Sequence, residues 1–217
     1  MCQTDSRGRQ GNLEWFLNAN KSSRKTIFSA LHRRPDYFHN SARFMAEEIF
    51  DVVNDRDEVI GQAPRKEVHA RGLWHRAVHV LVFNTRGEVF LQKRSMLKDT
   101  AKGKWDSSSS GHVDTGEDYD ICAVRELREE IGLVINQAPQ RLYKINACPE
   151  TGWEFCWVYR CASEGPFTLH PEEIETGDWF APQTVTKWVA EKPEDFASGF
   201  ILVWQRFLAM GGRTERG

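Results

Sequence analysis

The stretch that decides the fold begins at Gly111 and reads GHVDTGEDYDICAVRELREEIGL. From Tyr119 onward, its apolar residues recur at the three- and four-residue spacing of an α-helix. On a helical wheel they form one stripe, made of Ile121, Val124, Leu127 and Ile131. The pattern predicts an amphipathic helix over Tyr119–Glu130 that buries this stripe against a core.

The same helix carries three carboxylates on one arc, nearly opposite the apolar stripe: Glu126, Glu129 and Glu130. Thr115 with Asp118 resembles a capping-box start for this helix, and Gly132 is a C-terminal stop. A solvated acidic face is the plain interpretation of the arc. However, like charges at these spacings repel each other by roughly 0.2–0.5 kcal/mol per pair. A divalent cation would remove this repulsion, and clustered carboxylate oxygens suit Mg²⁺ or Mn²⁺.

The spacing around the helix resembles the Nudix box. Gly111 is followed by five residues and Glu117, then by seven residues and the run Arg125-Glu126-Leu127-Arg128-Glu129-Glu130-Ile131-Gly132. The resemblance to the Nudix superfamily extends from about Glu47 to Arg206. It implies an α/β (α+β) Nudix fold, in which a mixed β-sheet is sandwiched between helices and the box forms a loop, a helix and a second loop.

The resemblance also implies roles for the box residues. The three glutamates of the arc would bind Mg²⁺ or Mn²⁺, and one of them would act as a base. Arg125 would hold the carboxylates in place by bidentate hydrogen bonds, and Gly111 would allow a close backbone approach. Glu117 would brace the loop or reach the metal through water. The implied reaction is attack of water on one phosphorus of a small-molecule diphosphate.

A second resemblance, to the isopentenyl-diphosphate isomerase-like branch of the family, rests on several segments: His75–Val80, Leu91–Ser95, Lys98–Asp99, and Gly103-Lys104-Trp105 through Gly111-His112. The isomerases bind a metal through histidines, and His69, His75 and His112 fall close to those places. Imidazoles there could hold a second divalent ion, with His112 the strongest candidate for ligation or phosphate contact. A lone histidine is otherwise a surface or supporting residue.

Two departures argue against isomerase chemistry. The isomerases carry a catalytic cysteine where this chain has Ser110, and a hydroxyl is a far weaker acid than a thiol. They also carry Glu-x-Glu on a later strand, where this chain has Gly152-Trp153-Glu154. The remaining Glu154 would add a carboxylate to the metal site or lie on a solvent face.

Three functions are therefore weighed. The first is a metal-dependent pyrophosphohydrolase acting on a diphosphate linkage, with a nucleoside diphosphate derivative as the expected substrate. The second is isopentenyl-diphosphate delta-isomerase, and the third is a non-catalytic Nudix-fold ligand-binding module. Modules of the third kind usually lose box carboxylates, which this chain keeps. Lys93 and Arg94 end a predicted strand near the box and would contact phosphate or remain solvated.

Composition narrows the classes of partner. The chain has 217 residues, with 29 Lys and Arg against 31 Asp and Glu. This near balance disfavours a nucleic-acid polymer as partner. The apolar runs are far too short to span a bilayer, so no membrane partner is expected. Five cysteines without a C-x-x-C pair indicate a reducing, cytoplasmic compartment. A monomer and a homodimer are both compatible with the sequence.

The charge is uneven along the chain. Residues 1–44 contain eight Lys and Arg against three Asp and Glu, and they lack sustained apolar periodicity. We interpret them as a basic, poorly ordered extension. It could be an organelle transit peptide, an upstream extension of a shorter product that starts at Met45, or an accessory arm. The predicted Nudix domain spans 45–210, and 211–217 form a C-terminal tail.

Strand and helix patterns fill the predicted domain. No regular βαβ alternation is visible, which favours a mixed sheet. The expected strands are Phe50–Asn54, Glu58–Pro64, Arg76–Phe83, Glu88–Arg94, Arg141–Ala147 and Trp153–Cys161. The Ser-rich segment Trp105–Val113 is expected to be a short strand that enters a loop. The expected terminal helices are Pro182–Ala190 and Phe196–Met210.

Overall fold

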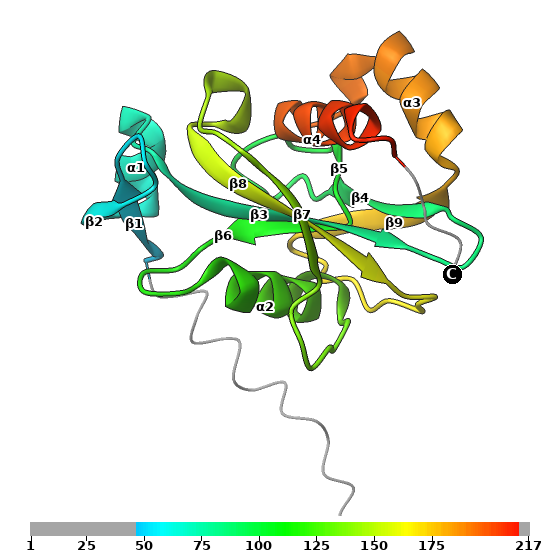
Figure 1. Ribbon diagram of the computed structural model, residues 1–217, viewed down its shortest axis with the longest axis horizontal. Helices are drawn as coiled ribbons and strands as arrows, with labels where there is room; N and C mark the ends of the chain where they lie inside the picture. Colours follow the sequence, from blue (N-terminus) through cyan, green and yellow to red (C-terminus); the bar gives the residue numbers. More distant parts are fainter. Residues whose placement is uncertain (1–46, 213–217) are drawn as a thin grey trace, which may run out of the picture. The chain divides into compact units, whose positions relative to one another are not determined.

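A mixed seven-stranded sheet is the centre of the computed structural model, which describes residues 47–212 (Figure 1). Its order is β5 (Trp105–Asp106), β4 (Val89–Arg94), β3 (His75–Phe83), β8 (Glu154–Ala162) and β7 (Gln140–Ile145). In addition, β6 (Ser109–His112) pairs with β3, and β9 (Ile174–Phe180) pairs with β4. The pairing of β3 with β8 is parallel, and the other pairings are antiparallel.

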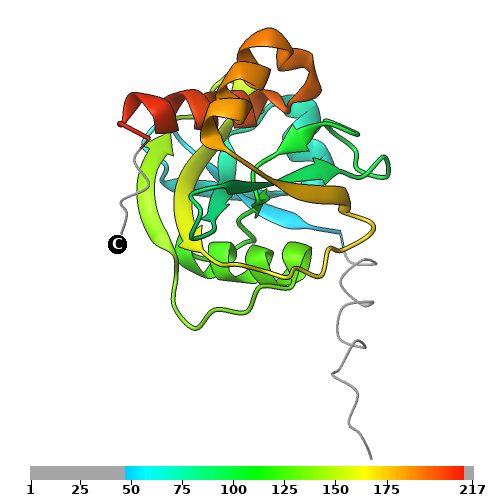
Figure 2. The same ribbon diagram turned by 90° about the vertical axis from the view of Figure 1, so that its right-hand side faces the viewer.

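The central strand β3 is buried on both faces because its β-branched and apolar residues alternate between two cores. Val78, Val80 and Val82 contribute to the core beneath α2 (Tyr119–Ile131). Leu81 and Phe83 contribute to the opposite core, beneath α4 (Ser198–Ala209). Accordingly, α2 covers one face of the sheet, while α3 (Pro182–Glu191) and α4 lie over the other (Figures 1 and 2).

A smaller unit flanks one end of the sheet. It consists of β1 (Ile49–Val53), β2 (Val59–Pro64) and α1 (Arg65–Arg71) (Figure 1). The turn of this hairpin is anchored to the main sheet at Asp57, whose carboxylate accepts hydrogen bonds from Arg76 Nε at 2.6 Å and from the Tyr119 hydroxyl at 2.9 Å. A two-stranded hairpin is marginal alone, so these contacts fix where α1 stands.

The fold prediction is confirmed in class and in most elements. The one short strand expected within Trp105–Val113 is instead two short strands, β5 and β6, and two elements were missed, α1 and β9. The chain also forms two one-turn helices, Pro149–Thr151 (η2) and Pro193–Asp195 (η3). The stop at Gly132 is confirmed, with φ 70°, but the capping start is wrong in detail. Asp118 caps α2 by accepting from Asp120 N at 2.7 Å, whereas the Thr115 hydroxyl donates to Ile49 O.

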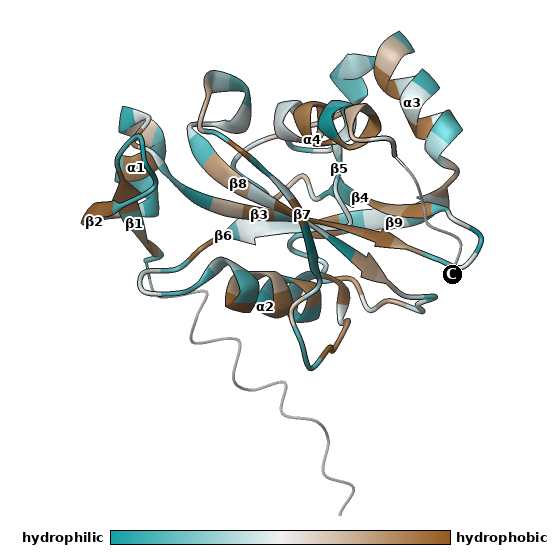
Figure 3. Cartoon of the chain, in the orientation of Figure 1, coloured by the Kyte–Doolittle hydropathy of each residue, from teal (hydrophilic) through white to brown (hydrophobic). Residues whose placement is uncertain are grey.

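The prediction of which face of α2 is buried was wrong. Ile121 is 62% exposed, whereas Glu126 and Glu130 are only 9% and 4% exposed. The carboxylates of Glu126 and Glu130 therefore turn toward the sheet, and part of the apolar stripe turns outward. Figure 3 shows hydrophilic and hydrophobic residues interspersed along α2. Leu127 and Ile131 are fully buried as predicted. They lie where the predicted buried face and the observed buried face of α2 overlap.

The predicted extension, residues 1–44, lies outside the described residues, and so does most of the tail. The domain boundaries at 45 and 210 remain predictions. None of the helices within residues 47–212 has the length and apolarity needed to cross a membrane. The four cysteines in this range are free thiols, namely Cys122, Cys148, Cys156 and Cys161.

The observed orientation of α2 yields a stability prediction. Leu127→Ala removes a fully buried side chain and should lower the free energy of unfolding by about 2–5 kcal/mol, because it leaves a cavity. Ile121→Ala, on the exposed side of the same helix, should change it by no more than about 0.5 kcal/mol. Urea denaturation of both variants measures the difference. Equal losses would contradict the orientation.

Candidate active site

Glu126 of α2 packs directly on Gly111. A Cβ added at Gly111 would lie 2.1 Å from Glu126 Cδ and 2.2 Å from Oε1, so a larger residue there would have to displace this carboxylate. Gly111 lies in β6, and its missing side chain would point toward α2. The group that lies against this glycine is a carboxylate, and the role of Gly111 in the site remains a prediction.

Arg125 joins the box residues into one network. Its Nε and Nη2 donate to the two oxygens of Glu117 at 2.9 and 2.8 Å, a bidentate pair. Its Nη1 contacts Glu126 and donates to Glu129 Oε2 at 3.2 Å, and Nη2 also donates to the carbonyl of His112. Burial opposes the charge of Arg125, but the bonds to Glu117 and the charge of Glu126 raise its pKa. These contacts link Arg125 with Glu117, Glu126 and Glu129, and the bracing role of Arg125 and Glu117 remains a prediction.

Glu130 is held by donors from two strands. Its Oε2 accepts from Gln92 Nε2 at 3.0 Å and from the backbone N–H of Ser110 at 2.9 Å. Gln92 is almost completely buried in β4. Gln92 was not assigned to the site from the sequence. A polar residue directly after the apolar run VFL was the available signal for it.

Burial raises the pKa of both Glu126 and Glu130, and their negative neighbours add to the effect. The negative charges of Glu126 and Glu130 are therefore not fully balanced by the positive charges and hydrogen-bond donors around them. The Ser109 hydroxyl oxygen is also buried, and it has no hydrogen-bond partner within residues 47–212. Strand alternation places Ser109 on the same face of β6 as Gly111. The three box glutamates are not among the groups of described residues whose ligand atoms all lie within 4.8 Å of one another, so the structure does not bring them together as a compact ligand set. Their carboxylate oxygens are of the kind that Mg²⁺ or Mn²⁺ prefers.

A second group of potential ligands lies on the other face of β6. His69, His75, His112 and Glu154 each offer one atom, and all four atoms lie within 4.8 Å of one another. His112 Nε2 is 3.0 Å from Glu154 Oε1 and 3.3 Å from His69 Nε2, and His75 Nε2 is 3.5 Å from Glu154 Oε1. Two ligands of a tetrahedral ion with bonds near 2.0–2.1 Å stand about 3.3 Å apart. The spacing thus fits a four-coordinate metal.

The hydrogen bonds and charges of this cluster agree with ligation. His75 Nδ1 is 2.8 Å from the carbonyl of Leu73 and must donate to it, which leaves Nε2 with a lone pair. That buried Nε2 has no hydrogen-bond partner in the described residues. Burial lowers the pKa of His112 to about 4, so its imidazole is neutral. Burial alone would raise the pKa of Glu154, but His112 and His75 hold it well below its usual range. Neutral imidazoles and an ionised carboxylate are the metal-binding forms.

The two predicted phosphate contacts have protein partners. Lys93 Nζ lies 3.0 Å from Glu175, and Arg94 is buried, with Nη1 3.4 Å from Asp106. Their role in substrate binding remains a prediction. Two cations not assigned from the sequence lie nearer the clusters. Arg65 Nη1 is 3.4 Å from His112 Nδ1, and the charge of Lys98 acts on the carboxyl of Glu130.

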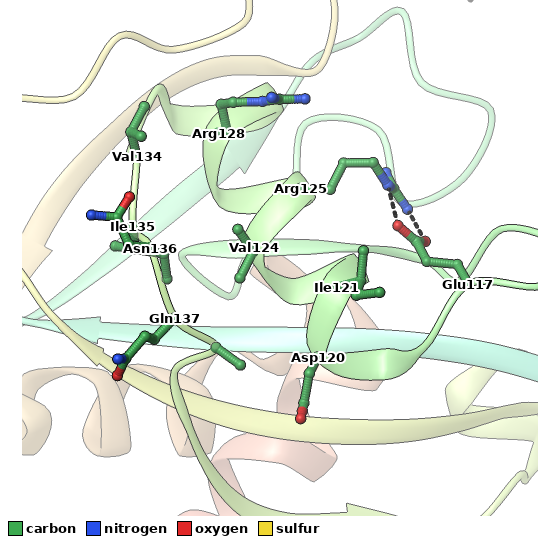
Figure 4. A pocket seen from close by; sticks show the side chains of 11 residues that line it. Glu117, Asp120, Ile121, Val124, Arg125, Arg128, Val134, Ile135, Asn136 and Gln137 are labelled. Atoms are coloured by element: carbon green, nitrogen blue, oxygen red, sulfur yellow. Dashed lines mark hydrogen bonds and ion pairs between the residues drawn. The ribbon is translucent and has the colours of Figure 1, made fainter.

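A cavity of about 480 Å³ lies on the outer side of α2 (Figure 4). Ile121, Val124 and Val134 supply part of its apolar lining, and Arg125 with Glu117 form one wall. The three box glutamates are not among its lining residues. The cavity therefore lies apart from the buried carboxylates of Glu126 and Glu130.

This geometry agrees with the family that the chain matches. A family model described as the NUDIX domain matches residues 73–200, more than half of the chain. The protein belongs to the Nudix family, and it is a Nudix hydrolase by its fold and its relatives.

Several relatives share most of their length with this chain. A Nudix hydrolase of Yersinia pestis, described as uncharacterized, is 34% identical over 64% of this chain and 76% of its own. YfcD of Escherichia coli, with the same description, is 30% identical over 76% of this chain and 91% of its own. A crystal structure from Deinococcus radiodurans has a TM-score of 0.67 and 28% identity, and covers 73% of this chain and 98% of that one. These matches do not separate the isomerase-like branch from other Nudix proteins.

Gly111→Ala tests the contact at the centre of the box. The added methyl group must displace the Glu126 carboxylate, because its Cδ would lie 2.1 Å from the new Cβ. We expect Mn²⁺ affinity to fall by about 10–100-fold, measured by water-proton relaxation. Gly61→Ala is the matched control, since nothing lies within 4 Å of a Cβ there. Unchanged Mn²⁺ binding in Gly111→Ala would refute the role of the box carboxylates.

Proposed function

We propose that this protein is a divalent-metal-dependent pyrophosphohydrolase that cleaves a diphosphate linkage in a small organic molecule, most simply a nucleoside diphosphate derivative. The observation that carries the proposal is the buried carboxylate group of the box, braced by Arg125 and packed on Gly111. A resident Mg²⁺ or Mn²⁺ would supply Lewis-acid stabilisation of the phosphate oxygens. Glu126 and Glu130 would hold it, because they are the more buried pair.

In the proposed reaction, water adds to one phosphorus and the bridging P–O bond breaks, with the electron pair leaving on the departing phosphate. The water loses a proton to a carboxylate. We assign this role to Glu129, whose side chain is 22% exposed and is the most accessible of the three. Its bond to Arg125 orients it. We assign phosphate contact to Lys98 and Arg65, although both also pair with carboxylates of the protein, Lys98 with Glu173 and Arg65 with Glu48 and Asp99.

We further propose that His69, His75, His112 and Glu154 hold a second ion. The donor set of three imidazoles and one carboxylate suits Zn²⁺, Mn²⁺ or another transition metal better than Mg²⁺. The buried Nε2 of His75 supports this assignment, because it lies 3.5 Å from Glu154 Oε1 and has no hydrogen-bond partner within the described residues. We place the protein in the cytoplasm on its cysteine usage.

The rival isomerase remains less favoured. Ser110 stands at the position of the isomerase cysteine, and its backbone N–H is engaged by Glu130. A non-catalytic module is disfavoured because every box carboxylate is kept and held. Supplying isopentenyl diphosphate and finding the dimethylallyl isomer without phosphate release would replace our proposal with the isomerase.

A metal-dependent substrate screen tests the main proposal. It should cover nucleoside di- and triphosphates, sugar nucleotides, dinucleotide cofactors and prenyl diphosphates. On the best substrate, Glu129→Gln and Glu130→Gln should each lose about 10²–10⁴-fold in rate. Glu191→Gln removes an exposed carboxylate of α3, paired only with Lys187 at 3.8 Å, and should keep full activity. Equal turnover in all variants would defeat the assignment.

Metal analysis tests the second ion separately. In protein loaded with Zn²⁺ and freed of excess, His69→Gln should lose the ion of the cluster, because one of four ligands is gone. Arg71→Gln is the control on the same helix, since its side chain is exposed and pairs only with Glu67. Bound metal is measured by elemental analysis. Retention of all Zn²⁺ by His69→Gln would show that the four residues hold no ion.

A further inference from the structure

Trp153 adopts a backbone conformation that side chains rarely take. Its φ is 68°, in the left-handed region that favours glycine. It directly precedes Glu154, a residue of the His/Glu cluster, and follows the one-turn helix η2. Non-glycine residues persist in this region only when surrounding contacts hold them, and they concentrate at functional sites.

Hydrogen bonds fix the backbone of Trp153 on both sides. Its N–H donates to Cys148 O at 2.8 Å, which closes the η2 turn. Its carbonyl accepts from His75 N at 3.3 Å. His75 and Glu154 are direct partners in the parallel register of β3 and β8. The turn at Trp153 therefore delivers Glu154 opposite His75.

The indole ring of Trp153 packs against Gly72, a second residue with a left-handed backbone conformation. A Cβ at Gly72 would lie 3.0 Å from Trp153 Cδ1 and 3.1 Å from Nε1. Gly72 is the C-cap of α1, with φ 61°, and its N–H contacts the carbonyl of His69. The ring thus rests on the end of the helix that carries His69. Trp153 nevertheless remains 36% exposed, so burial of its ring does not by itself account for the backbone conformation.

We propose that Trp153 is a positioning residue for the His/Glu metal cluster. Its left-handed backbone sets Glu154 against His75, and its ring holds the end of α1, and with it His69, at the distance that ligation needs. The inference rests on the second metal site proposed above. It assigns no contact between Trp153 and the metal or the substrate.

Co²⁺ binding to the full chain tests this role. Four-coordinate cobalt with imidazole ligands absorbs visible light much more strongly than six-coordinate cobalt with oxygen ligands, so the cluster is seen apart from the box. In Trp153→Gly, the backbone adopts the positive φ without strain, but the indole ring is removed. We expect its Co²⁺ dissociation constant at the cluster to rise by about 10–100-fold, with weaker visible bands. Trp153→Phe keeps a ring on Gly72 and should restore most of the affinity.

Gly72→Ala provides a second, independent variant. Its methyl group would press on the indole, so it should also weaken Co²⁺ binding, and less so in the Trp153→Gly background, where the ring is gone. Gly211→Ala is the matched control, because Gly211 has φ 96° and nothing within 4 Å of a Cβ. It carries the left-handed strain without the contact and should bind Co²⁺ as the wild type does.

The outcomes separate the two proposals. If the wild-type chain shows no strongly absorbing Co²⁺ site, or if His69→Gln leaves that site unchanged, the metal cluster itself is wrong. If the wild type binds Co²⁺ at the cluster and Trp153→Gly and Gly72→Ala bind it equally tightly with the same spectrum, the positioning role is overturned. A rise in KM with unchanged Co²⁺ binding also overturns it, because the ring would then serve the substrate.

Discussion

The packing of Glu126 on Gly111 is the contact on which the site depends. It brings α2 so close to β6 that Glu126 and Glu130 leave water. One guanidinium, Arg125, then faces the carboxylates of Glu117, Glu126 and Glu129. A single positive charge cannot balance three negative charges in a buried setting, where solvent screening is weak. Protonation of a carboxyl group whose pKa is raised by burial, or a bound cation, would relieve this imbalance, which supports the metal that we propose.

The sequence predicted the box residues but not the face that they occupy. Periodicity assigns charged residues to water, so the arc of Glu126 and Glu130 was placed outward and Ile121 inward. The structure reverses both because the helix buries functional carboxylates against a glycine. Conflicts of this kind between pattern and structure are expected at functional sites. The spacing of the motif was the more reliable signal, since it encodes contacts and not solvent preference.

The His/Glu cluster could not be predicted from local pattern. His69 lies on a seven-residue helix after Pro64, too short to show a periodic signal, and it meets Glu154 only through the fold. The position of His69 depends on the hairpin anchored at Asp57 and on the contact of Trp153 with Gly72. Both contacts join segments far apart in the chain. The resemblance to the isomerases named the three histidines, and only the structure brings their Nε2 atoms together with a carboxylate.

The two clusters share one strand, and this sharing constrains both. Gly111 faces α2 and the box, and the next residue, His112, faces the opposite side, because side chains alternate along a strand. A shift of one residue in the pairing of β6 with β3 would therefore put an imidazole where Glu126 packs and remove a ligand from the cluster. Arg125 reinforces the register by donating to the carbonyl of His112 while it braces the box glutamates. The same guanidinium therefore contacts the box glutamates and the backbone of a residue of the His/Glu cluster.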